Sequence, residues 1–222
     1  MLSRTFFRWS AVAVFLGALV LGTGYLLRAN IEKENIDQFA STQGLLSSIM
    51  VAGGSLLFLF GLPGLFASQN LYSSTSGIVA SLLSFTGIAA FHLGTLALYF
   101  VAPVLVTHSA ATRALMYSDE PPFPRFALFW ATSLLIQVVG LVWIGLRLLK
   151  NGNTVKIASL LLVAGGLVFL SAPFIYFRLI KPANTITMIG FSIIAYSMFR
   201  TNRSTERQKK ANQIKRRPLV TS

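Results

Sequence analysis

Long apolar runs separated by short polar segments occupy most of the chain from residue 9 to residue 199. A membrane-spanning helix needs roughly 20 apolar residues, because about 30 Å of hydrocarbon must be crossed at about 1.5 Å per residue. Six runs fit this requirement and contain no Asp, Glu, Lys or Arg: residues 9–27, 44–66, 77–100, 126–146, 157–177 and 183–199. The pattern predicts an all-α integral membrane bundle of about six transmembrane helices.

The first and last runs leave the span count open. Arg4 and Arg8 precede the first run, as cations do in a secretory signal peptide, and cleavage there would leave five spans. The run is longer than a typical signal-peptide core and no clear small-x-small site ends it, so we expect an uncleaved anchor. The sixth run is the shortest, at 17 residues, and Pro182 before it suits a helix start.

Cations between the runs predict the orientation. With the amino terminus inside, two cations precede the first span, three lie between the fourth and fifth, and eight follow the sixth, so 13 of 19 are cytoplasmic. Cytoplasmic segments carry the excess of Lys and Arg. Both termini are therefore expected in the cytoplasm, with residues 1–199 forming the transmembrane domain. The absence of cysteine and of long loops suits a multi-pass protein of a bacterial plasma membrane.

The segment 200–222 is a basic tail that we expect to be disordered. Anionic headgroups attract cations beside a span by about 1 kcal/mol each, so the expected partner is the bilayer surface rather than nucleic acid. The residues expected to contact lipid are Arg200, Arg203, Arg207, Lys209, Lys210, Lys215, Arg216 and Arg217.

Polar residues within the spans share helix faces. On the third span, Ser81, Ser84, His92, Thr95 and Tyr99 follow the i, i+3, i+4 spacing of a single face. On the fourth span, Trp130, Ser133, Gln137 and Gly140 do the same. Polar groups at this depth turn away from lipid, and the two spans are antiparallel neighbours in the sequence. His92 and Gln137 are thus the candidate centre of a small intramembrane polar pocket, with Ser84, Thr95, Tyr99 and Ser133 around them. An interhelical hydrogen bond that only fixes packing is the alternative.

Composition limits the chemistry. Hydrophobic residues make up 54% of the chain and charged residues 11%, and there is no cysteine to serve as nucleophile or metal ligand. Neither a nucleotide-binding loop nor a zinc-binding helix motif is present, and no span carries the carboxylate that ion coupling normally needs. We therefore expect a non-catalytic multi-pass membrane protein without a cofactor.

Two other functions remain open. A small-solute transporter or channel would use the same polar stripe, and the similar segments 51–54 and 163–166 hint at an inverted repeat of three spans. An intramembrane enzyme at the outer leaflet would need acidic side chains of the outer loops to converge on a cavity. Those acids are Glu32, Glu34, Asp37, Asp119 and Glu120.

Overall fold

The computed structural model of the chain describes residues 3–27, 41–108, 124–149, 153–175 and 179–215. Throughout these ranges the structure is helical, with short turns and without strands. The α-helices are α1 (Arg4–Leu27), α2 (Thr42–Ser68), α3 (Thr75–His108), α5 (Pro124–Leu148), α6 (Asn153–Ile175) and α7 (Ile180–Lys215), and a 3₁₀ turn, η2 (Leu71–Ser73), joins α2 to α3. The all-α prediction is confirmed.

Five helices contain a segment long and apolar enough to cross a membrane. These segments are Thr5–Leu27, Thr42–Ser68, Thr75–Leu96, Leu128–Leu148 and Val155–Ala172. The expected sixth span lies in α7, which does not reach the same apolarity within the described part of the chain. The chain thus forms an apolar helical bundle of the kind found in membranes.

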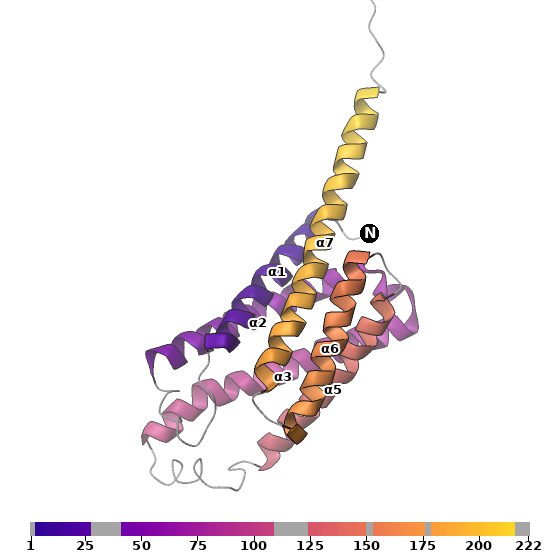
Figure 1. Cartoon of the computed structure of the whole chain (residues 1–222). Helices are drawn as coiled ribbons and strands as arrows, with labels where there is room; N and C mark the ends of the chain where they lie inside the picture. The colour runs from indigo at the N-terminus through magenta and orange to yellow at the C-terminus, as the bar shows by residue number, and fades with distance from the viewer. Residues whose placement is uncertain (1–2, 28–40, 109–123, 150–152, 176–178, 216–222) are drawn as a thin grey trace, which may run out of the picture.

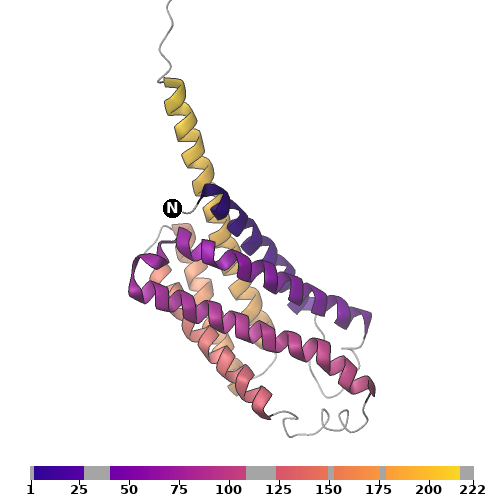
Figure 2. The ribbon, with the colours of Figure 1, turned by 180° about the vertical axis from the view of Figure 1, so that it is seen from behind.

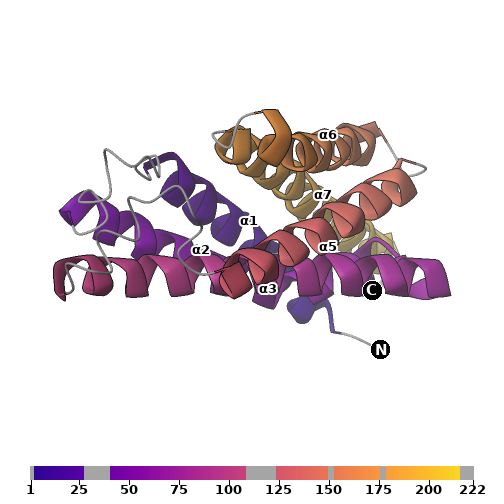
Figure 3. The ribbon, with the colours of Figure 1, turned by 90° about the horizontal axis from the view of Figure 1, so that it is seen from below.

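Neighbouring helices in the chain are also neighbours in space (Figure 1). α1 packs along α2, α3 along α5 and α6 along α7, while α5 contacts α6 and α1 contacts α7. The order around the bundle is therefore α1, α2, α3, α5, α6, α7, with α7 returning to α1. The view from behind shows α2 and α3 crossing the face of the bundle, and the end-on view shows α5 crossing α3 (Figures 2 and 3).

α7 is the longest helix, at 36 residues, and continues past the other helices (Figure 1). It leaves the bundle at the end where α1 begins. The helix extends to Lys215, into the segment for which we predicted a disordered tail.

Glycines allow two pairs of helices to pack with their backbones almost in contact. A Cβ added at Gly54 of α2 would lie 2.8 Å from Cα of Leu21 of α1. Between α3 and α5, a Cβ added at Gly140 would lie 2.6 Å from Cα of Ser84, and one at Gly87 would lie 2.5 Å from Cα of Gln137. Small residues permit this approach, and the resulting van der Waals contact holds helices together where apolar lipid supplies little hydrophobic force.

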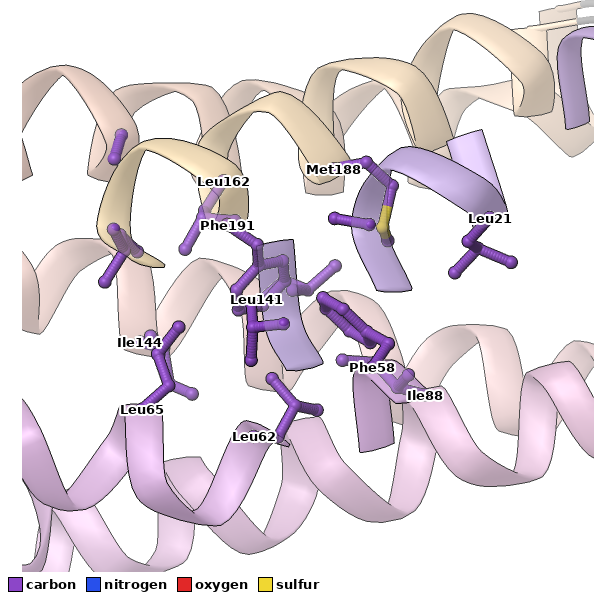
Figure 4. Packing of buried hydrophobic residues seen from close by; sticks show 14 of the residues in the cluster. Leu21, Phe58, Leu62, Leu65, Ile88, Leu141, Ile144, Leu162, Met188 and Phe191 are labelled. Carbon is purple, nitrogen blue, oxygen red and sulfur yellow. The ribbon is translucent and has the colours of Figure 1, made fainter. Parts of the chain in front are cut away.

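The interior of the bundle is filled by large apolar side chains from all six helices (Figure 4). Phe58 of α2 and Phe191 of α7 meet edge to face with ring centroids 4.9 Å apart. Large apolar side chains also cover the outside, among them Trp9, Phe60 and Leu128, each more than two-thirds exposed. A surface this apolar suits contact with lipid rather than water.

Candidate functional site

His92 of α3 is the centre of the polar groups inside the bundle. It is 1% exposed, and its Nδ1 lies 3.1 Å from the hydroxyl of Tyr25 on α1, which is also buried. Depending on the tautomer, the phenol donates to Nδ1 or the protonated Nδ1 donates to the phenol oxygen. Nε2 of His92 is buried and has no hydrogen-bond partner among the described residues. One edge of the imidazole is thus fixed and the other is unpaired.

Aromatic side chains lie around the imidazole. The Phe91 ring meets those of Trp130 on α5 and Phe169 on α6, at centroid distances of 5.2 and 6.0 Å. The Tyr25 and His92 rings are 6.0 Å apart. Water competes poorly for the hydrogen bonds of a group enclosed in this way, and the low local dielectric strengthens those bonds. The site therefore has apolar walls and a few directed polar atoms.

Gln137 of α5 is fully buried where α5 crosses α3 beside Gly87. Its Oε1 and Nε2 both lack a hydrogen-bond partner in the described part of the chain. Burying an amide without a hydrogen-bond partner costs several kcal/mol when judged from transfer between water and an apolar solvent. The cost is about 1–3 kcal/mol when judged from mutations in proteins. Gln137 is not hydrogen-bonded to His92, whose partner is Tyr25 instead.

The other predicted pocket residues divide into two groups. The hydroxyls of Thr95 and Ser133 donate to carbonyls of their own helices, those of Phe91 and Phe129, at 2.8 and 2.7 Å. The hydroxyl of Ser84 is buried and unpaired among the described residues, as is that of Ser81. Tyr99 lies in α3, but its side chain is outside the described part of the structure. Ser84 and Gln137 are therefore the unsatisfied groups at the α3–α5 crossing.

Tyr25 and Asn184 are among the buried polar residues that the sequence analysis did not single out. Tyr25 stands near the end of the first span and gave no polar periodicity that would single it out. Asn184 of α7 is fully buried, and both atoms of its amide lack a partner among the described residues. Asn184 could have been found from the sequence, because an Asn inside an apolar run is as costly to expose to lipid as a Gln is.

The acidic loop residues and most of the basic tail residues are not described at the level of their side chains. The five acidic residues of the loops predicted to face outside, and Arg216 and Arg217 of the tail, lie outside the described residues. Arg200 is exposed on α7, and the next five predicted lipid contacts, from Arg203 to Lys215, are placed by the helix backbone alone. The described residues contain no group of three or more His, Asp or Glu side chains that would hold a metal ion.

No family model matches the chain, and no curated protein or solved structure shows significant similarity to it.

Proposed function

We propose that this protein is a non-catalytic multi-pass membrane protein whose bundle contains a small polar pocket at His92. The main support is a group of buried polar atoms that have no hydrogen-bond partner among the described residues, including those of His92, Gln137, Ser84 and Asn184. Natural proteins pair most buried polar groups, and exceptions call for water, a ligand or a functional role. Four such side chains on three helices favour a site that receives a polar guest.

The proposal includes six spans with both termini in the cytoplasm of a bacterial plasma membrane. The supporting observations are the excess of cations at one side of the predicted spans and the position of α7. Because α7 leaves the bundle where α1 begins, a membrane-spanning α7 brings both ends of the chain to one side.

Anionic lipid headgroups are the proposed partner of the basic end of α7. The charge of this segment supports the contact, since eight cations and one acid follow residue 199.

Water access to His92 tests the pocket. We would label the histidines of the full chain with ¹⁵N in lipid nanodiscs and measure magnetisation transfer from water to the imidazole protons. His108→Gln identifies the His92 signal, because the chain has two histidines. Transfer to His92 is expected, whereas the methyl groups of Ile144, which is fully buried in α5, serve as the dry control. A His92 as dry as Ile144 would refute the pocket.

Transport of a small solute is the second candidate. One observation favours it: buried polar atoms without a hydrogen-bond partner among the described residues occur at two depths, at His92 and at the crossing of Gln137 with Gly87. Gly87 is five residues from His92, which is about 7.5 Å along a helix. Polar atoms at successive depths are what a permeation path requires.

Liposome flux measurements distinguish transport from binding. Reconstituted protein would be tested with glycerol and urea, and the flux compared with that of His92→Phe and Gln137→Leu variants. Transport predicts a flux above that of empty liposomes that both variants lower. If the wild-type flux equals that of empty liposomes and His92 is accessible to water, the pocket does not transport these solutes and the binding function is favoured.

A further inference from the structure

Three polar side chains from three different helices lie at one depth in the bundle. A Cβ added at Gly22 of α1 would be 3.8 Å from Cβ of Met188 of α7. Because α1 and α7 run in opposite directions, this contact places Tyr25, three residues on, level with residue 185. Asn184 is therefore beside Tyr25 in depth, and Tyr25 is hydrogen-bonded to His92.

The opposite side of the bundle gives the same register. A Cβ added at Gly165 of α6 would lie 3.2 Å from the amide nitrogen of Thr187 of α7. Asn184, three residues before Thr187, is then level with residue 168, next to Phe169. Phe169 meets Phe91, the neighbour of His92 in α3. Two independent chains of contacts thus bring Asn184 to the depth of His92.

Asn184 and His92 both face the interior of the bundle. Asn184 shares a helix face with Met188 and Phe191, which are buried in the core, and it is itself fully buried. His92 shares a face with Ile88 and Thr95, both buried. In the part of the chain that the structure describes, Nε2 of His92 and the amide oxygen and nitrogen of Asn184 have no hydrogen-bond partner. Together they offer an acceptor, a donor pair and an imidazole nitrogen that serves as either.

We propose that His92 and Asn184, with Tyr25 holding the imidazole, form a binding site for a small uncharged molecule that both donates and accepts hydrogen bonds, of which a primary carboxamide is the best fit. An Asn amide and a second carboxamide are complementary, each donating one hydrogen bond and accepting one. The inference rests on the pocket proposed above and adds the class of its occupant.

The absence of charge from the spans selects an uncharged ligand. No Asp, Glu, Lys or Arg occurs in the apolar runs 9–27, 77–100 and 183–199, which carry the three residues. An ion transferred to this depth would lose its hydration without gaining a counter-charge, whereas a neutral amide recovers its hydrogen bonds from the site. Acetate and methylammonium are therefore expected to be excluded.

The ends of two helices indicate the side of entry. Tyr25 is two residues from the end of α1, and Asn184 is four residues from the start of α7. On α1 and α7 the site thus lies about one helical turn from the ends opposite to the projecting part of α7, whereas α3 continues past His92 to His108. In the proposed orientation, these ends face the outside of the cell.

Acetamide titration of the full chain in nanodiscs tests the site, with the ¹⁵N signal of His92 Nε2 as the readout. Acetamide is expected to shift the signal saturably, and equal concentrations of acetate or methylammonium are expected to leave it unchanged. Asn184→Leu should weaken acetamide binding at least tenfold. Thr187→Val is the matched control, because the Thr187 hydroxyl donates to Ala183 O of its own helix at 2.9 Å; its affinity should equal that of the wild type.

Three results would overturn the inference: no saturable shift with acetamide, an equal shift with acetate, or wild-type affinity in Asn184→Leu. The water-transfer measurement separates this failure from failure of the pocket itself. Transfer to His92 without acetamide binding would leave the pocket standing and exclude this ligand class. A dry His92 would reject both. If Asn184→Leu fails to fold, Asn184→Ala, which also removes the amide and introduces no charge, should likewise weaken acetamide binding.

Discussion

The hydrogen bond between Tyr25 and His92 joins α1 to α3 across the bundle interior. Tyr25→Phe removes the hydroxyl and leaves both ring nitrogens of His92 unpaired. We expect the free energy of unfolding to fall by about 0.5–2 kcal/mol, the range for hydrogen bonds between membrane helices and for buried groups that lose a partner. Unfolding by SDS titration from mild detergent micelles, followed by far-UV circular dichroism, measures the change.

Tyr196→Phe is the control for that substitution. Tyr196 is 59% exposed on α7, so the same loss of a hydroxyl there should change stability by less than about 0.5 kcal/mol. Equal effects of the two substitutions would show that the Tyr25 hydroxyl contributes nothing specific to the bundle.

Gln137 should behave in the opposite way. Because neither atom of its amide has a partner among the described residues, Gln137→Leu is expected to leave stability unchanged or to raise it by up to about 1 kcal/mol. Ser133→Ala, which removes a hydroxyl bonded to its own helix, is the control in the same SDS titration. A clear loss of stability in Gln137→Leu would mean that the amide fixes the packing of α5, which is the structural alternative to a pocket.

Helical periodicity explains how much of this site was accessible from the sequence. His92, Ser84 and Gln137 stand out because a polar group in a span must turn inward, and that rule needs only the spacing along one helix. The partner of His92 depends on which helix lies across the interior, and this is decided by glycine contacts such as Gly54 with Leu21. Single-helix periodicity carries no information about that arrangement, so it suggested Gln137 and missed Tyr25.

Adjacent glycines in α2 allow the packing of α1 against α2 to be tested directly. A Cβ added at Gly54 would lie 2.8 Å from Cα of Leu21, whereas one added at Gly53 would meet nothing within 4 Å. Gly54→Ala should therefore destabilise the protein by about 1–3 kcal/mol, because backbone must move to admit the methyl group. SDS unfolding measures the loss.

Gly53→Ala is the matched control, one residue away in the same helix and with the same chemical change. It should be neutral or slightly stabilising, because alanine favours the helix over glycine. If both substitutions cost the same, the loss would reflect glycine's backbone properties and not the approach of α1.

The basic end of α7 gives a graded prediction about lipid contact. At about 1.5 Å per residue, a straight helix carries Arg203 about 5 Å beyond Arg200 and Lys215 about 22 Å beyond it. Attraction to anionic headgroups fades over about 8 Å at physiological salt. The Arg200→Gln, Arg203→Gln pair should therefore lower the preference for phosphatidylglycerol over phosphatidylcholine more than the Lys210→Gln, Lys215→Gln pair does.

Electron spin resonance of spin-labelled lipids measures that preference in reconstituted bilayers. Raising the salt concentration should reduce the wild-type preference and the difference between the variants. An equal effect of both pairs would indicate that the end of α7 bends onto the membrane surface, in which case distance along the helix has no influence.

At the scale of the whole molecule, apolar run length predicted the helical class and about six spans, because the hydrocarbon thickness fixes the required length whatever the helices pack against. Five of these runs correspond to helices long and apolar enough to cross a membrane. α7 is harder to assign from composition. Asn184 and Thr187, which are buried in the bundle, make it more polar than the other spans. A helix that hides polar residues among its neighbours gives a weak hydropathy signal, and its continuation to Lys215 cannot be inferred from apolar runs at all.

Whether α7 spans the membrane determines on which side of it the carboxyl-terminal end of α7 lies. The chain has no cysteine, so single cysteines at Ser3, Ser118 and Ser204 report their location without background. With six spans, a membrane-impermeant maleimide added to intact cells should label Ser118→Cys, and it should label Ser3→Cys and Ser204→Cys only after lysis. If α7 stays on one side, positions 3 and 204 react from opposite sides. That result would leave five spans and remove the membrane around Asn184, so it bears on the binding site as well as on the topology.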